Sequence, residues 1–328
     1  MDRVTAGAAY SPLEIGQATP KVPGFDEFWE GQIKALRSRQ YTTEMKLVEQ
    51  PDKRVNVYDV RLDDKTLALT GYMVIPAKAK PGAHPLLMMF NGAGTMGANY
   101  KSAIQRATRY GFIVFNLSIH DVPNGASKQE MAALRRRPDI DNYRYRGIDS
   151  PETFAIREIF MRDVRALDYM KTRPEWDGKR IVMQGGSLGG AQAVFASSIE
   201  PQTTFCIANA PALCSHFGAK LNQNPGWPNM LALQKKKGPE FLAKVENTMA
   251  YFDLVNIGRN VKCPVYTSCG FIDEICPPTS VYSFYNSLTV EKSMANVVTG
   301  AHGPVLDSKE RSVFVQNMEY MEKAFFQK

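Results

Sequence analysis

The stretch Gln184-Gly185-Gly186-Ser187-Leu188-Gly189-Gly190 decides the fold of this chain. It carries the pattern G-x-S-x-G, centred on Ser187, between an apolar run expected as a strand (180–184) and a small-residue run expected as a helix (190–199). In that setting the glycines allow a sharp turn and a close approach of strand and helix, and the serine is presented at the carboxyl end of the sheet. The helix N-terminus favours negative charge developing beside it. The stretch therefore predicts a nucleophilic serine, Ser187, on an α/β fold.

The apolar runs around this stretch are typical of a parallel sheet covered on both faces, because short strands alternate with helical stretches. We expect strands at 86–90, 112–117, 180–184, 205–208, 264–269 and 295–298. Ser150-Pro151 predicts a helix start, with Ser150 as N-cap and proline at the first helical position. Further helices are expected at 190–199, 277–286 and 308–326.

The N-terminal part has a different pattern. Residues 25–36 form an amphipathic helical pattern, and 46–50, 54–62 and 66–75 alternate like antiparallel strands between turn residues. We expect one domain over 1–328, with a helical lead-in at 1–45. The segment 119–149 is long, polar and irregular, and we expect it near the active site or an interface.

A nucleophilic serine needs a base and an acid, which follow it in the chain order Ser, acid, His. His216 and His302 are the histidines after Ser187. His302 lies in a loop after the last expected strand, whereas His216 lies where a helix or lid is expected. Asp273 lies in the loop after the strand 264–269 and would hold the imidazole of His302 in the correct tautomer. These positions predict the triad Ser187–Asp273–His302 and an α/β-hydrolase fold, with a mostly parallel central sheet, helices on both faces and an antiparallel N-terminal lead-in.

The oxyanion formed during such a reaction needs two backbone N–H donors. We expect one from Leu188, directly after the nucleophile. The second is expected from Ala93, in the glycine-containing loop that follows the strand 86–90. His120 follows the strand 112–117 at the same sheet edge, so a substrate contact is a hypothesis for it.

Composition excludes several other classes. The net charge is +7, but the two short basic runs lie far apart and carry no interleaved aromatic residues, so we expect no nucleic-acid partner. No apolar run is long enough for a membrane span, and no membrane partner is expected. Five scattered cysteines without CxxC spacing predict neither a disulfide framework nor a zinc site. No nucleotide-binding or metal-binding pattern is present, so we expect no cofactor.

With these residues in view, the chain resembles the acetyl xylan esterase and cephalosporin C deacetylase family over nearly its whole length. The matching stretches are Gly24-Phe25-Asp26-Glu27-Phe28-Trp29, Arg146-Gly147-Ile148-Asp149, Arg162-Asp163-Val164-Arg165-Ala166, the elbow Gly185 to Gly190, Tyr251-Phe252-Asp253-Leu254-Val255-Asn256 and Ile272-Asp273-Glu274-Ile275-Cys276-Pro277-Pro278.

The resemblance implies the triad and oxyanion donors chosen above, removal of a small acyl group such as acetyl, no cofactor and a homo-oligomer. Three departures stand out. Ala93 replaces a usual tyrosine, Ser118-Ile119-His120 replaces an R-G-Q signature, and Gly303 replaces the glutamate that usually follows the histidine. They leave the alcohol part of the substrate open.

Two alternatives remain at this point, a peptidase or other acyl hydrolase of the same fold and a non-catalytic binding protein that retains it. The location also stays open between cytoplasmic, if the chain is complete, and exported, if a signal peptide was removed.

Overall fold

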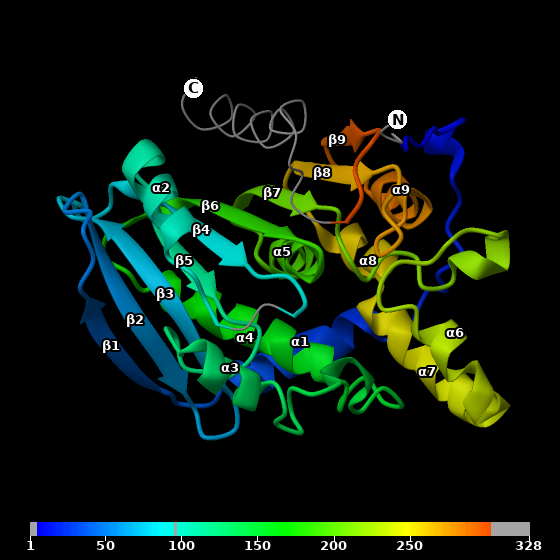
Figure 1. The fold of residues 1–328 in the computed structure, drawn as a ribbon, viewed down its shortest axis with the longest axis horizontal. Helices are drawn as coiled ribbons and strands as arrows, with labels where there is room; N and C mark the ends of the chain where they lie inside the picture. Colours follow the sequence, from blue (N-terminus) through cyan, green and yellow to red (C-terminus); the bar gives the residue numbers. More distant parts are fainter. Residues whose placement is uncertain (1–4, 95–96, 303–328) are drawn as a thin grey trace. The chain divides into compact units, whose positions relative to one another are not determined.

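The computed structural model describes residues 5–94 and 97–302 (Figure 1). The chain divides into two compact units. Unit 1 comprises Met1–Lys21, Gly185–Pro201 and Phe205–Lys328, and unit 2 comprises Val22–Gln184 and Gln202–Thr204. The expectation of a single domain stays a prediction. The helix expected at 308–326 and the departure at Gly303 lie outside the described residues.

Unit 2 contains a mixed sheet with the strand order β1-β2-β3-β5-β4-β6. Its strands are β1 (Thr42–Val48), β2 (Val55–Asp63), β3 (Ala68–Pro76), β4 (His84–Phe90), β5 (Ile113–Leu117) and β6 (Trp176–Gly186), the last of which continues into unit 1. The pairs β1–β2, β2–β3 and β3–β5 are antiparallel, whereas β4 and β5 are parallel. The predicted antiparallel lead-in is therefore confirmed.

Every residue of β5 and all inner residues of β3 are buried, which shows that both faces of this sheet are covered. Helix α2 (Lys101–Tyr110) and helix α4 (Ala155–Met170) both pack on β3 and β5, and α4 also contacts α1 (Phe25–Arg37). The amphipathic helix expected at 25–36 is confirmed, and it buries Trp29, Ile33 and Leu36.

Helix α4 begins four residues later than Pro151, so the predicted start at Ser150-Pro151 is wrong. Residues 150–154 form a turn instead, in which the Ser150 carbonyl accepts from the backbone N–H groups of Thr153 (3.2 Å) and Phe154 (3.1 Å). The Ser150 hydroxyl bonds the side chain of Glu152 rather than a helical N–H. The local turn therefore takes the bonds that an N-cap would have made.

The segment 119–149 is more regular than the sequence predicts. It contains helix α3 (Lys128–Leu134) and a 3₁₀ turn at Tyr143–Tyr145. Ser127 and Glu130 form a capping box at the start of α3, which satisfies two backbone donors reciprocally. The sequence pattern did not predict this short helix, because its start depends on side-chain capping and not on apolar periodicity.

Unit 1 contains three parallel strands, β7 (Thr203–Asn209), whose first two residues belong to unit 2, β8 (Val265–Gly270) and β9 (Lys292–Val297). Its helices are α5 (Leu188–Ile199), α6 (Met230–Gln234), α7 (Pro239–Phe252), α8 (Leu254–Ile257) and α9 (Pro278–Ser287), with 3₁₀ turns at Pro12–Glu14, Gly218–Leu221, Lys235–Lys237 and Gly258–Asn260. Parallel strands end at the same edge of a sheet, so the loops after β8 and β9 begin side by side. This arrangement decides where the site forms.

All five cysteines are buried and free. Among the described residues, we find no helix with the length and apolar character that crossing a membrane requires.

A glycine in the sheet of unit 2 provides a test of the packing. A Cβ on Gly71 would lie 2.7 Å from the Phe115 ring and 2.8 Å from the Asn116 carbonyl. Gly71→Ala should lower the free energy of unfolding by about 1–3 kcal/mol, measured by urea denaturation, because this crowding forces neighbouring backbone apart. Gly31→Ala in helix α1 is the control. It meets nothing within 4 Å and should stabilise slightly. Equal midpoints for both variants would contradict the packing described here.

Candidate active site

Ser187 stands on a strained turn between β6 and α5. Its backbone has φ 56° and ψ −125°, a region that residues with a Cβ rarely occupy. A Cβ on Gly185 would lie 2.1 Å from the Gly189 carbonyl oxygen, so this close approach requires glycine. The Ser187 side chain is half-buried and reachable. The predicted elbow geometry is therefore present.

His302 lies between Ser187 and Asp273. Its Nε2 is 3.0 Å from the Ser187 Oγ, and its Nδ1 is 2.8 Å from the Asp273 Oδ2. With the Nδ1 proton directed at the carboxylate, Nε2 is the ring nitrogen left to accept the serine proton. The structure thus brings together the three residues that the sequence singled out.

Asp273 is oriented by more than the imidazole. Its side chain is fully buried, and its Oδ1 accepts from the backbone N–H groups of Ile275 (2.8 Å) and Cys276 (2.9 Å). One carboxylate oxygen is thus fixed by its own loop, and the other is left for His302.

The loops that carry Asp273 and His302 pack directly on each other. The Ile272 N–H donates to the Gly300 carbonyl at 3.0 Å. A Cβ on Gly270 would lie 2.3 Å from that same carbonyl oxygen, so glycine is required at this contact. The distance between acid and base is therefore set by backbone contacts at the ends of β8 and β9.

The expected oxyanion donors lie at a helix start and in a turn. Leu188 is the first residue of α5, so its N–H has no partner within the helix. Ala93 lies in an exposed turn after β4. That turn is anchored by Asn91, whose Nδ2 donates to the Leu117 carbonyl at 2.6 Å. The role of both amides stays a prediction.

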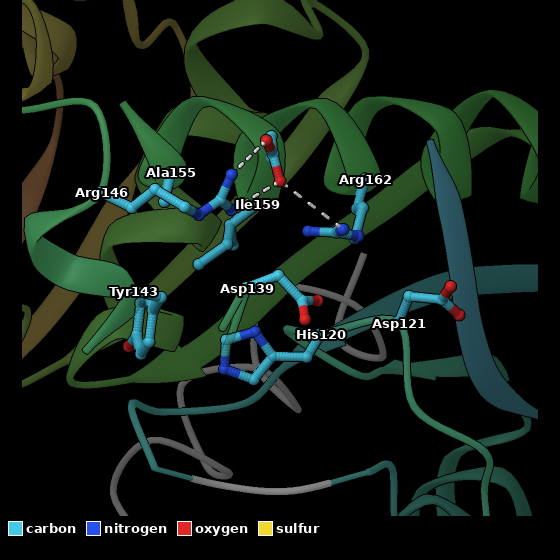
Figure 2. A pocket seen from close by; sticks show the side chains of 9 residues that line it. His120, Asp121, Asp139, Tyr143, Arg146, Ala155, Ile159 and Arg162 are labelled. Carbon is cyan, nitrogen blue, oxygen red and sulfur yellow. Dashed lines mark hydrogen bonds and ion pairs between the residues drawn. The ribbon is translucent and has the colours of Figure 1, made fainter. Parts of the chain in front are cut away.

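His120 lines a small polar pocket in unit 2. Figure 2 shows its ring beside the side chains of Asp139 and Tyr143. The ring is 4.7 Å from the Tyr143 ring, edge to face, and the cavity between the lining side chains measures about 10 Å³. That is room for one water molecule at most. The substrate contact expected for His120 stays a prediction.

The carboxylates that line this pocket are paired with arginines. Arg61 pairs with Asp121 (2.5 Å), Arg137 with Asp139 (2.6 Å) and Arg146 with Glu158 (2.9 Å). Arg162 also lies 3.9 Å from the Glu158 carboxylate, and it donates to two backbone carbonyls, those of Ala68 (2.9 Å) and Ile119 (3.5 Å). These contacts tie the segment 119–149 to the sheet and to α4.

The departure at Ser118-Ile119-His120 leaves that part of unit 2 well packed. All three residues are buried, and the Ser118 hydroxyl donates to the His120 carbonyl at 2.8 Å. Burial and the nearby Arg162 lower the pKa of His120 to about 4, so its ring is neutral at pH 7.

His216, the other histidine after Ser187, is fully buried in unit 1. Burial lowers its pKa, and no hydrogen bond to either ring nitrogen is found in the part of the chain that the structure describes. It lies in a turn and not in a regular helix, and it takes no part in the hydrogen bonds among Ser187, His302 and Asp273. Its backbone N–H donates to Asp253, a residue of the matching stretch Tyr251 to Asn256 to which the sequence patterns gave no role.

The acetyl xylan esterase (AXE1) family model matches residues 15–318. The chain belongs to the acetyl xylan esterase family. The resemblance predicted from the sequence is therefore confirmed.

A curated relative, the acetyl esterase Axe7A of Xylanibacter ruminicola, is 31% identical over 288 residues, which are 86% of this chain and 64% of that protein. The chain thus spans less than two thirds of the length of this relative.

Two solved structures share the fold. The acetyl xylan esterase from Paenibacillus sp. R4 has a TM-score of 0.80 and 21% identity, with 94% of this chain and 98% of that chain covered. Acetyl xylan esterase 1 from Thermoanaerobacterium sp. JW/SL YS485 has a TM-score of 0.79 and 19% identity, with 96% and 98% covered. The predicted α/β-hydrolase fold is confirmed.

The buried His120 predicts a pH dependence of stability. The folded protein binds this proton with a pKa of about 4, whereas an unfolded histidine binds it near 6.5. Between these values the unfolded chain holds more protons, so stability falls as the pH falls. His120→Gln should remove up to about 3 kcal/mol of the loss between pH 7 and pH 4, measured by denaturation at each pH. His216 contributes in the same direction to both proteins. Parallel pH profiles would contradict the neutral, buried ring.

Proposed function

We propose that the chain is a serine esterase that removes acetyl or other short acyl groups from ester substrates, acetylated carbohydrates above all. The observation that carries this proposal is the continuous set of contacts from Ser187 through His302 to Asp273. Membership in the acetyl xylan esterase family and the acetyl esterase named among the relatives support the acyl group and the sugar ester.

In the first half of the reaction Ser187 attacks the ester carbonyl. His302 Nε2 takes the hydroxyl proton as the C–O bond forms, and Asp273 stabilises the imidazolium through Nδ1. The carbonyl oxygen becomes an oxyanion, which the N–H groups of Leu188 and Ala93 would hold. His302 then donates this proton to the leaving alcohol as the ester C–O bond breaks, and an acetyl-enzyme remains.

In the second half a water molecule replaces the alcohol. His302 takes one water proton while the hydroxide attacks the acetyl-enzyme, and it then returns that proton to the Ser187 oxygen as the acyl bond breaks. Acetate leaves and the enzyme is restored. Each attack places a proton on His302, and the departure of the leaving group that follows uses that proton, so the three side chains suffice for the proton transfers.

Other properties belong to the same proposal. The family resemblance implies a homo-oligomer, and no cofactor and no nucleic-acid partner are expected. The rivals are a peptidase or another acyl hydrolase of this fold, and a binding protein that retains the fold. A binding protein has no need of a histidine within hydrogen-bond distance of both a serine and a buried carboxylate, which favours an enzyme.

The proposal is tested with 4-nitrophenyl esters of increasing acyl length. We expect hydrolysis of the acetate, lower kcat/KM for longer chains, and a loss of at least about 10³-fold in Ser187→Ala, since that variant lacks the nucleophile. The controls are a peptide 4-nitroanilide panel and acetylated xylan. Peptide cleavage without acetate release would favour the peptidase. Equal activity of the wild type and Ser187→Ala would reject the serine mechanism.

The second oxyanion donor has its own test. Ala93→Pro deletes one backbone N–H, and losing such a donor costs about 2.7–4 kcal/mol, or 10²–10³ in kcat. Ala93→Gly is the matched control, because it keeps the N–H. We expect kcat to fall in the proline variant alone, with KM nearly unchanged, in steady-state kinetics on 4-nitrophenyl acetate. A proline variant with the kcat of the glycine variant would exclude this amide.

A further inference from the structure

A strained segment, residues 210–216, follows β7 in unit 1. Three of its non-glycine residues have positive φ, Ala210 at 38°, Leu213 at 58° and Ser215 at 52°. Residues with a Cβ rarely adopt this conformation, and they keep it only where surrounding contacts hold them. The contacts that hold this segment therefore determine the position of whatever the segment touches.

Asp253 supplies two of those contacts, at the end of the segment. Its side chain is completely buried, directly before α8. Oδ1 accepts from the backbone N–H groups of Ser215 (2.9 Å) and Val255 (3.0 Å). Oδ2 accepts from the His216 N–H (2.8 Å) and from the Thr19 hydroxyl (2.8 Å). Four donors match the acceptor capacity of an ionised carboxylate, so Asp253 joins the strained segment, α8 and the N-terminal segment.

The strained segment is bonded to the backbone of the nucleophile. The Ala212 N–H donates to the Ser187 carbonyl at 3.0 Å. The Ser187 N–H donates to the carbonyl of Asn209 at 2.9 Å, one residue before the segment begins. Both backbone groups of Ser187 are therefore held by residues at or beside the segment that Asp253 fixes.

The same segment also reaches the loop of Asp273. The Leu213 N–H donates to the Trp227 carbonyl at 2.8 Å, and the Trp227 N–H donates to the Ile275 carbonyl at 3.0 Å. Ile275 in turn donates its N–H to the Asp273 Oδ1. A short series of backbone hydrogen bonds thus connects the strained segment to the carboxylate that orients His302.

We propose that Asp253 is a positioning residue for the reaction at Ser187. It acts through residues 210–216, which fix the nucleophile backbone on one side and the Asp273 loop on the other. The inference rests on the proposed function, because it concerns turnover at Ser187. Loss of this anchor misplaces the Ser187 Oγ relative to His302 without removing a substrate contact, so kcat falls while KM stays nearly constant.

The test is Asp253→Asn, which keeps the shape but turns one acceptor oxygen into an NH₂ group that faces N–H or O–H donors. Active sites are titrated with a fluorophosphonate probe that labels the serine, so that kcat is counted per reactive site. We expect kcat per titrated site on 4-nitrophenyl acetate to fall by about 10-fold or more, with KM within about twofold. An unchanged kcat per titrated site would overturn the proposal.

Asp64→Asn is the matched control. Asp64 also has a fully buried carboxylate, which accepts from the backbone N–H groups of Thr66 (3.0 Å) and Leu67 (2.7 Å), but it belongs to unit 2. This variant should lower the unfolding midpoint and yet keep the wild-type kcat per titrated site. If the role of Asp253 is merely structural, Asp253→Asn should behave in the same way. Fewer serines would then react with the probe, but each reactive site would turn over at the wild-type rate.

A second variant covers the case in which Asp253→Asn does not fold. Thr19→Val removes one of the four donors and should lower kcat per titrated site by about twofold. An unchanged rate there would also overturn the proposal.

The rate of phosphonate labelling separates this inference from the proposed function. A wild type that reacts with the probe but hydrolyses no acetyl ester rejects the esterase proposal. Slower labelling of Asp253→Asn than of Asp64→Asn would still support the positioning role, and equal labelling rates would reject it.

Discussion

The backbone of Ser187 is the constraint on which the rest of unit 1 depends. For a residue with a Cβ, a backbone conformation with φ 56° costs of order 1–3 kcal/mol of stability. The turn persists because many surrounding contacts hold it. Gly185 and Gly189 approach more closely than any side chain would allow, and both backbone groups of Ser187 are hydrogen-bonded. The strain places the hydroxyl at the end of the strand, where His302 is within reach.

The parallel order of β7, β8 and β9 brings the loops of Asp273 and His302 together beside Ser187. The acid and the base follow neighbouring strands, and their loops contact each other through Gly270 and Gly300. A sheet fixes the spacing of its strand ends far more tightly than a loop fixes its own tip. The Asp273–His302 contact is therefore set by backbone geometry.

The elbow and the triad could be predicted from the sequence because their chemistry requires particular side chains in a particular chain order. Asp253 could not be identified in this way, since three of its four donors are backbone N–H groups that any residue supplies. It lies in the matching stretch Tyr251 to Asn256, but that match gave it no role. An aspartate just before an apolar stretch is also the ordinary pattern of a helix cap. The start of α4 was mispredicted for a related reason, because the Ser150 side chain bonds its own turn.

Burial alone does not tell which carboxyl groups serve the site. Asp163 in α4 is as completely buried as Asp253, yet neither of its oxygens has a hydrogen-bond partner in the described part of the chain, and burial raises its pKa well above the usual value. Asp253 has four donors, and Asp273 has two backbone donors and His302. A carboxyl group that must hold an imidazole, or several N–H groups at once, needs its oxygens directed at those donors. The arrangement of donors, which comes from the folded backbone, is therefore what distinguishes Asp253 and Asp273 from Asp163.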